Sequence, residues 1–412
     1  MTFRVIALLV GTTLWVSYGA AQSVPGGSDG IKVGDGRLHP YVEAETHYVV
    51  HPGYASGAPN DAMLAVRPGL DLDVPSEKID LKFSGDLEYQ QYLGLGSSQT
   101  LDYSGLMGHG SILSSINRQG SLGLRLREEF TRSAGPSIMS GGRLLHFTND
   151  VGFGLDVRPG GGALTFSADY SLFWDRYDRG GNSVPDPANL DNMRHNPKLR
   201  ALWKFLPKTA VFLEAEGYLT QFYDFKDPDP TGPTVTKSDV NSNIFLVQLG
   251  AAGSITSRIS ALVKAGYGNT FMAGPDNFNS FVGQAELHYA FTETTGFKAG
   301  LLRTVQPASL FKYFALNRFY VGCRQAFTGK IQGDLTLSYD DQRFPRPAAG
   351  PQHSRRDGDL LADIGLNYQV TEWLNVALMD RIDWRTSTYE NGAQSKDAYA
   401  RNDLFLRVGF RY

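Results

Sequence analysis

The strongest constraint in this sequence is an alternation of apolar and polar side chains at every second residue, repeated over long segments. In IDLKFSGDLEY, residues 79–89, the apolar side chains share one face of an extended strand and the polar ones share the other. LTFSADYSLFW, residues 164–174, repeats the arrangement. A period of two residues predicts β-strands with two chemically different faces. Apolar residues spaced by three and four are almost absent, so the sequence predicts an all-β protein.

Short turns and longer loops alternate between these segments. The short turns lie near residues 75–77, 117–119, 159–161, 206–208, 254–257, 291–294, 328–329 and 371–372. From one short turn to the next there is room for one hairpin and one longer loop, as in an up-and-down meander. Between His39 and Tyr412 we count about eighteen strands without a domain boundary. If residues 99–115 and 148–158 are not strands, the count is sixteen.

Three features favour a membrane barrel over a soluble sandwich. The segments run for about 11–16 residues, whereas strands of soluble proteins usually have five or six. Many apolar faces end in an aromatic residue of the kind found at the headgroup level of a bilayer, namely Tyr89, Trp174, Tyr223, Tyr267, Tyr289, Tyr339 and Trp384. Only a closed barrel satisfies every backbone group of such strands in lipid. Residues 39–412 are therefore expected to form a transmembrane antiparallel up-and-down β-barrel in the bacterial outer membrane.

The first residues predict export. Arg4 precedes an apolar segment at residues 5–16, and Gly19 and Ala21 provide the small side chains that a signal peptidase reads. Residues 1–21 are expected to be a cleavable signal peptide, with a buried N-terminal helix as the alternative. Residues 22–38 then form a short periplasmic segment. An even number of strands places both ends of the barrel in the periplasm and the long loops outside.

If the apolar faces meet lipid, the opposite faces line the lumen. The candidates for this lining are Asp80, Lys82, Asp86, Glu88, Glu214, Glu216, Arg318, Arg324, Asp334, Asp340, Asp363, Arg381, Asp383, Arg385 and Arg407. Acidic and basic strips alternate, so many of these side chains are expected to pair across strands. We therefore expect a solvated, mutually neutralising wall, with a single selectivity ring as the alternative. Asp380 falls on the lipid face, which a bulge, a shallow depth or a different register would explain.

Charge and motifs argue against several other functions. The net charge of −3 and the isoelectric point near 6.3 predict no nucleic-acid partner. Cys323 is the only cysteine, so there is no disulfide framework. The histidines lie outside HExxH and GxSxG contexts, so neither an enzyme nor a cofactor is expected. The alternative is a metal site formed by Glu43, Glu45, His47 and His51, although a strip of lumen residues has the same spacing.

The chain closes with LFLRVGFRY, residues 404–412, in which apolar side chains alternate up to the final Tyr412. We expect this segment to be the last barrel strand, paired with the first strand near residues 40–49. Phe410 and Tyr412 resemble the signal that the outer-membrane barrel assembly machinery recognises. That machinery and outer-membrane lipid are therefore the expected partners.

The segment PYVEAETHYVVHPGYASGAPNDAMLAVRPGLDLDVPSEKIDLKFSGDLEYQQYLG, residues 40–94, resembles the opening of the β-barrel porin families of bacterial outer membranes. The matching pieces are Tyr41, Tyr48, Pro68-Gly69-Leu70, Tyr89 and Tyr92. Members of this kind are linked to polysaccharide export, so the resemblance implies a passive channel for a secreted polysaccharide that acts with periplasmic export proteins. The alternatives are a general diffusion porin for small hydrophilic solutes and an adhesion or assembly scaffold.

Overall fold

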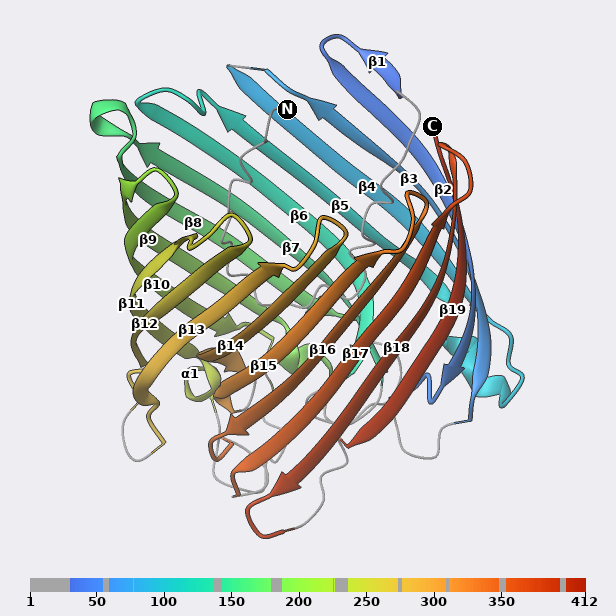
Figure 1. The fold of residues 1–412 in the computed structure, drawn as a ribbon. Coiled ribbons are helices and arrows are strands. Elements are labelled where there is room, and N and C mark those ends of the chain that lie inside the picture. Colours follow the sequence, from blue (N-terminus) through green and yellow to red (C-terminus); the bar gives the residue numbers. More distant parts are fainter. Residues whose placement is uncertain are drawn as a thin grey trace.

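The structure is a computed structural model that describes residues 30–54, 59–76, 78–136, 143–178, 187–224, 226, 236–272, 276–308, 311–347, 353–392 and 398–412. In these residues, eighteen strands form one closed antiparallel barrel (Figure 1). The strands are β2 (Gly36–Val50), β3 (Asp61–Val74), β4 (Ile79–Tyr92), β5 (Gly105–Ile116), β6 (Leu122–Pro136), β7 (Arg143–Val157), β8 (Leu164–Tyr177), β9 (Asn192–Leu206), β10 (Thr209–Phe222), β11 (Ser242–Ser254), β12 (Ile259–Asn269), β13 (Asn279–Ala290), β14 (Thr295–Ala308), β15 (Lys312–Ala326), β16 (Ile331–Phe344), β17 (Arg355–Gln369), β18 (Leu374–Tyr389) and β19 (Tyr399–Arg411).

Each barrel strand pairs with the next in the chain, and β19 pairs with β2 to close the ring. The expected all-β, up-and-down architecture with eighteen strands is therefore confirmed. A further short strand, β1 (Ile31–Val33), pairs with the beginning of β2, at the same end of the barrel as the C-terminus (Figure 1). The expected signal peptide at residues 1–21, and the expected periplasmic segment as far as residue 29, lie outside the described residues.

Of the two segments on which the strand count depends, one differs from the expectation. Residues 148–158 fall almost entirely in β7, but the first part of 99–115 is the 3₁₀ helix η1 (Ser98–Tyr103), and β5 starts only at Gly105. The strand prediction for residues 99–104 is therefore wrong. The backbone N–H of Gln99 donates to the side chain of Ser97, and the hydroxyl of Thr100 donates to Asp61. These local hydrogen bonds compete with strand pairing.

The other helical elements are short: η2 (Pro159–Gly161), η3 (Pro187–Leu190) and α1 (Lys237–Val240). Among the residues that the structure describes, no helix has the length and apolar character needed to cross a bilayer.

The barrel exposes apolar side chains on its outer face and buries charged ones on its inner face. In β19, Leu404, Leu406 and Phe410 are 42%, 46% and 48% exposed, whereas the intervening Phe405 and Arg407 are 4% and 8% exposed. Every barrel strand carries exposed large apolar residues in this way. Soluble proteins rarely expose so extensive an apolar surface. The outer face is therefore the surface that meets lipid.

The aromatic residues expected at the membrane surfaces divide into three groups. Tyr89, Tyr267, Tyr339 and Trp384 are exposed on the outer face. Trp174 and Tyr289 also lie on barrel strands but are half-buried. Tyr223 lies just beyond the end of β10.

The hairpin formed by β14 and β15 leaves the wall at its loop end. Pairing between β13 and β14 stops at Gly283 and Arg303, although β14 and β15 remain paired as far as Ala308 and Lys312. Beyond this point, Val305 packs into a buried apolar cluster with Ile244 of β11 and Val282 of β13. Ile244 and Val282 are on the inner face of their strands, because they alternate with the exposed Phe245 and Phe281. The end of this hairpin therefore folds over the inner face and narrows the lumen.

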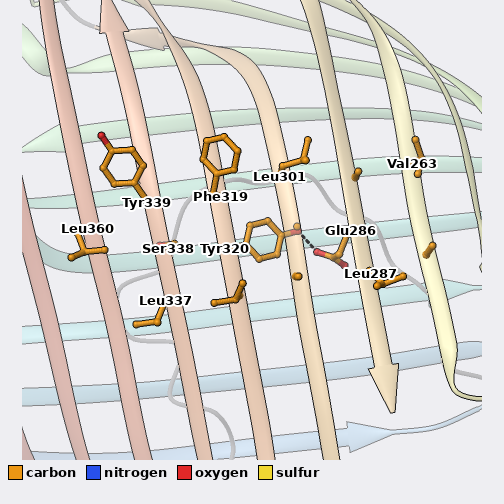
Figure 2. Close-up of a pocket in the computed structure, with 15 residues that line it drawn as sticks. Val263, Glu286, Leu287, Leu301, Phe319, Tyr320, Leu337, Ser338, Tyr339 and Leu360 are labelled. Carbon is orange, nitrogen blue, oxygen red and sulfur yellow. Dashed lines mark hydrogen bonds between the residues drawn. The ribbon is translucent and has the colours of Figure 1, made fainter. Parts of the chain in front are cut away.

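Three inner-face aromatic rings lie against glycines of the neighbouring strand. A Cβ atom at Gly69 would lie 2.3 Å from Cζ of Tyr41, and one at Gly300 would lie 2.3 Å from Cζ of Tyr320. The three pairs are Tyr41–Gly69, Phe212–Gly250 and Tyr320–Gly300, each directly opposite in register. In Figure 2 the ring of Tyr320 extends toward Glu286, to whose carboxylate its hydroxyl donates. Glycine is required here because the ring occupies the space of a side chain.

Candidate functional site

The inner wall of the barrel borders a cavity of about 370 Å³. The cavity follows a continuous arc of wall from β16 through the closing β19–β2 pair to β7. Six of the predicted lumen-lining residues border it: Asp86, Glu88, Asp334, Asp363, Arg381 and Arg407. The seam at which the barrel closes therefore lies within a charged arc of the described inner wall.

At this seam, a set of buried side chains connects β19 with β2. Arg407 donates from Nε to Oε1 of Glu45 at 2.6 Å. His47 places Nε2 at 2.8 Å from Oε2 of Glu45 and Nδ1 at 2.7 Å from Oδ1 of Asp403. The imidazole ring stacks on Phe405 with centroids 4.5 Å apart. His47 therefore links two carboxylates and is held in place by an aromatic ring.

Arg67 of β3 extends the same network to β4. Its Nη1 donates to Glu43 at 3.0 Å, and its Nη2 lies 3.4 Å from Glu45. Its Nε donates to Glu88 at 2.7 Å. Asp86 is more distant, at 3.9 Å from Nε of Arg67. A single guanidinium therefore faces carboxylates from both neighbouring strands, which keeps these buried acids compensated.

On β15–β18, the predicted cations pair with acids directly opposite them in register. Arg385 donates to both oxygens of Asp359, at 2.6 and 2.7 Å, which is a bidentate arrangement. The other pairs are Arg318–Asp340 at 2.6 Å, Arg324–Asp334 at 2.6 Å and Arg381–Asp363 at 2.9 Å. All four are cross-strand partners. Asp383 accepts hydrogen bonds from the hydroxyl of Tyr399 at 3.1 and 3.0 Å.

A third group occupies β9, β10 and β12. Glu214 lies between two lysines, with Lys198 and Lys264 each 3.2 Å from one of its carboxylate oxygens. Glu216 lies 3.9 Å from Nζ of Lys198 and accepts a hydrogen bond from Asn196 at 3.3 Å. Both predicted acids on β10 therefore have cationic neighbours on the inner face.

The remaining predicted residues lie close to a short turn. Asp80 accepts a hydrogen bond from Arg118 at 3.0 Å, and Lys82 lies 3.5 Å from Asp73. Both partners in the Lys82 pair have more than half of their side chain exposed. This pair therefore lies at the rim, apart from the buried networks.

Sequence reasoning missed several members of these networks. Asp403, Arg67 and Asp359 share the inner-face alternation of the predicted residues, so that signal was present in the sequence. The spacing of Glu43, Glu45 and His47 fits either a metal site with His51 or a strip of lumen residues, and it does not predict that His47 bridges two carboxylates. In the described part of the chain, no group of three or more histidine, cysteine or acidic residues is placed to hold a metal ion.

Some inner-face arginines lie over aromatic rings instead of beside acids. The guanidinium carbon of Arg194 is 4.3 Å from the ring centre of Phe173, and that of Arg200 is 4.2 Å from the ring centre of Phe212. Arg143 lies 5.3 Å from the ring centre of Tyr103. Within the described residues none of the three forms an ion pair with a carboxylate. These guanidinium groups therefore contact aromatic rings in place of a direct carboxylate partner.

Phe410 of the final strand and Asp380 of β18 lie on the outer face. Phe410 stacks on Trp373 with centroids 6.0 Å apart, and the backbone N–H of Tyr412 donates to the carbonyl of Pro40 at 3.0 Å. Asp380 accepts a hydrogen bond from Asn402 at 2.7 Å. Pairing of β18 with both neighbours is continuous through Asp380, so a bulge does not account for its outward position.

Comparison with known proteins gives a family match over nearly the whole chain. The model of a family described as "Putative beta-barrel porin 2" matches residues 24–412. No curated protein sequence matches.

Similar solved structures include three outer-membrane proteins of Pseudomonas aeruginosa. OccK2 (OpdF), solved in complex with glucuronate, is 10% identical with a TM-score of 0.48 over 91% of this chain and 98% of that one. OccK3 (OpdO) is 10% identical with a TM-score of 0.45 over 91% and 95%. The ferric enterobactin receptor PfeA is 10% identical with a TM-score of 0.46 over 91% and 80%.

The family match agrees with the structure, which has a closed eighteen-strand barrel, an apolar outer face and a charged inner wall. Together they indicate a channel-type protein of the bacterial outer membrane. The chain belongs to this family of β-barrel porins.

Proposed function

We propose that the barrel is a passive channel whose cargo is a secreted polysaccharide chain, exported with a periplasmic machine. The observation that carries this proposal is the pairing of inner-wall charges across neighbouring strands. Conduction requires contacts weak enough for the cargo to leave each site. Paired charges hold one another and leave a polar surface, which suits an uncharged, hydroxyl-rich polymer.

Aromatic rings on the inner wall add support for a sugar cargo. Tyr41 and Tyr320 are half-buried on this face, each against a glycine of the neighbouring strand. Their rings combine an apolar face with a polar hydroxyl. Sugar rings have the same combination of apolar faces and polar edges, so such side chains offer weak, repeated contacts along a path.

A general diffusion porin for small hydrophilic solutes is the second candidate. The observation in its favour is Arg194 and Arg200, which lie over aromatic rings and form no ion pair with a described carboxylate. Such cations would attract small anions, whereas a neutral polymer gains little from them. An adhesion or assembly scaffold is the remaining alternative.

The same proposal includes the processing and assembly of the chain. Residues 1–21 would be removed as a signal peptide, and residues 22–38 would remain as a short periplasmic segment. The fifteen predicted inner-face residues would line the path of the cargo. Phe410 and Tyr412, at the end of β19, would be recognised by the barrel assembly machinery.

Single-channel recording in planar bilayers tests whether the barrel conducts. We expect a stable current that neutral glucan oligomers reduce in a concentration-dependent manner. The variant R194Q/R200Q should lower the preference for anions without changing the block by glucan. A barrel that assembles but carries no current, with or without loop trimming, would contradict both channel proposals and leave the scaffold.

Deletion of the gene separates export from uptake. Loss of surface polysaccharide, restored by the full chain, would support the export channel. Unchanged polysaccharide together with reduced entry of small solutes would support the diffusion porin instead.

A further inference from the structure

The outer face of β12–β17 contains an apolar hollow of about 620 Å³. Its floor consists of three alanines, Ala261, Ala285 and Ala299, because their small side chains lie opposite larger apolar residues of the neighbouring strands. Val263, Leu301 and Phe319 are among the side chains around them, as Figure 2 shows. The hollow is therefore on the surface that meets lipid and not in the lumen.

A cluster of arginines begins beside this hollow, toward the long-loop end of the strands. Along β14, Arg303 follows Leu301 of the hollow after two residues, a step of about 7 Å. Along β16, Asp341 and then Arg343 follow Tyr339 in the same outward-facing alternation. Arg343 lies directly opposite the remaining member, Arg356 of β17.

Hydrogen bonds hold the cluster together around one carboxylate. Asp341 accepts from Nε of Arg343 at 3.1 Å, from Nε of Arg356 at 2.5 Å and from Asn317 at 3.2 Å. Asn317 in turn accepts from Nη1 of Arg303 at 2.7 Å. Two guanidinium groups contact a single acid and the third reaches it through Asn317, so this arginine cluster is positively charged.

Two of the arginines keep their terminal donors available. Arg343 and Arg356 each use only Nε to reach Asp341, and among described residues their Nη atoms have no hydrogen-bond partner. The side chains are 59% and 62% exposed. Guanidinium groups with free Nη donors bind phosphate oxygens in a fixed geometry. The pair is therefore suited to an anionic phosphate group.

The depth of the cluster in the membrane agrees with this ligand. Tyr339 of β16 and Trp384 of β18 are exposed on the outer face on either side of β17 and mark the headgroup level. Arg343 and Arg356 lie further toward the long-loop end, which faces the outer leaflet in proteins of this architecture. Tyr339 also lines the edge of the apolar hollow, and the rest of the hollow extends from it toward the short-turn end, at the level of the acyl chains.

We propose that the hollow and the arginine cluster together bind one anionic, phosphate-bearing lipid of the outer leaflet. Arg343 and Arg356 hold its phosphate, and an acyl chain lies over Ala285. A second copy of this chain fits less well, because a two-fold contact would bring the same arginines together. Free phosphate would occupy the arginines but leave the hollow open.

Native mass spectrometry of the full-length barrel in detergent tests the site with phosphatidic acid and phosphatidylcholine of equal chain length. Wild type should retain phosphatidic acid in preference. R343Q/R356Q should lose about tenfold or more of that affinity, since two cations near an anionic surface are removed. R176Q is the matched control, because Arg176 is an outward arginine of β8 with Nε 4.0 Å from Asp191. Equal retention of both lipids by wild type, or equal losses in the two variants, would overturn the proposal.

A second variant tests the hollow. A285F fills its centre and should weaken retention of phosphatidic acid several-fold, while heat-modifiable migration shows that the barrel is assembled. Inorganic phosphate at millimolar concentration should compete only weakly with the lipid. Complete displacement by inorganic phosphate, with A285F behaving like wild type, would show that the arginines bind free phosphate and would overturn the lipid assignment.

Discussion

Arg407 and Glu45 form a buried ion pair across the seam at which the barrel closes, with Nε 2.6 Å from Oε1. The residues are 362 positions apart in the chain, yet β19 and β2 place them directly opposite each other. Their side chains are only 9% and 2% exposed. The pair therefore joins the first and last barrel strands in a poorly hydrated part of the wall, where the loss of one partner is costly.

Replacing Arg407 with alanine should reduce the free energy of unfolding by about 3 kcal/mol, because Glu45 would keep a buried charge with less compensation. The measurement is urea-induced unfolding in lipid vesicles, followed by tryptophan fluorescence and by heat-modifiable migration. The variant should still assemble, because backbone pairing between β19 and β2 is unchanged.

The control for this prediction is Arg324→Ala. Arg324 donates to Asp334 at the same 2.6 Å, but its side chain is 59% exposed. An exposed pair contributes less than about 1 kcal/mol. Equal losses in the two variants would mean that burial at the seam adds nothing to the stability of the closing pair.

The alternation of side chains was sufficient to predict the barrel because every strand must present one face to lipid and one to the lumen. That local rule gave the strand number and the eight short turns between consecutive strands. It did not predict ion-pair partners such as Arg407 and Glu45, because register depends on how strands from distant parts of the chain align. His47 illustrates the same limit, since its two carboxylate partners come from different strands.

The alternation also fails to predict two other features, for different physical reasons. In Ser98–Tyr103 only the last three residues alternate between apolar and polar, and hydrogen bonds to Ser97 and Asp61 stabilise a 3₁₀ helix in place of a strand. Val305 follows the alternation of the lipid-facing residues of β14, yet it is fully buried because the hairpin folds over the inner face. An apolar residue at such a position has the same local pattern whether it meets lipid or a packed cluster.

Gly69→Val should disturb the inner wall, because its Cβ would lie 2.3 Å from the ring of Tyr41. We expect a loss of about 1–3 kcal/mol in the free energy of unfolding, as for other overpacked sites. Removing the ring with Tyr41→Ala in the same chain should recover part of the loss. Gly110→Val is the control, since nothing lies within 4 Å of a Cβ at that position. Failure of Tyr41→Ala to rescue would show that the ring is not the cause.

Asp380 places a carboxyl group on the outer face, where its described hydrogen-bond donor is Asn402 at 2.7 Å. Replacing both residues with leucine should raise the free energy of unfolding in vesicles by about 1 kcal/mol, because polar groups facing lipid are destabilising. Asp380→Leu alone should gain less, since it leaves the amide of Asn402 without its acceptor. A destabilised double variant would contradict this prediction and would mean that the hydrogen bond from Asn402 to Asp380 stabilises the barrel by more than the exposure of its polar groups to lipid costs.

Replacing Phe410 and Tyr412 with serine should reduce the fraction of chain that reaches the assembled, heat-modifiable form in cells. If these residues act as a recognition signal, the assembled fraction in cells will fall by more than the reduced stability of the purified barrel accounts for.

Trp373→Ala separates recognition from stability, because Trp373 stacks on Phe410 at 6.0 Å but lies outside the final strand. That variant should unfold at lower urea concentration and still assemble in normal amounts. The backbone hydrogen bond from Tyr412 to Pro40 can form in all variants, so the substitutions do not prevent closure of the barrel. Normal assembly of F410S/Y412S, or equal assembly defects in all variants, would contradict recognition of the terminal aromatic residues.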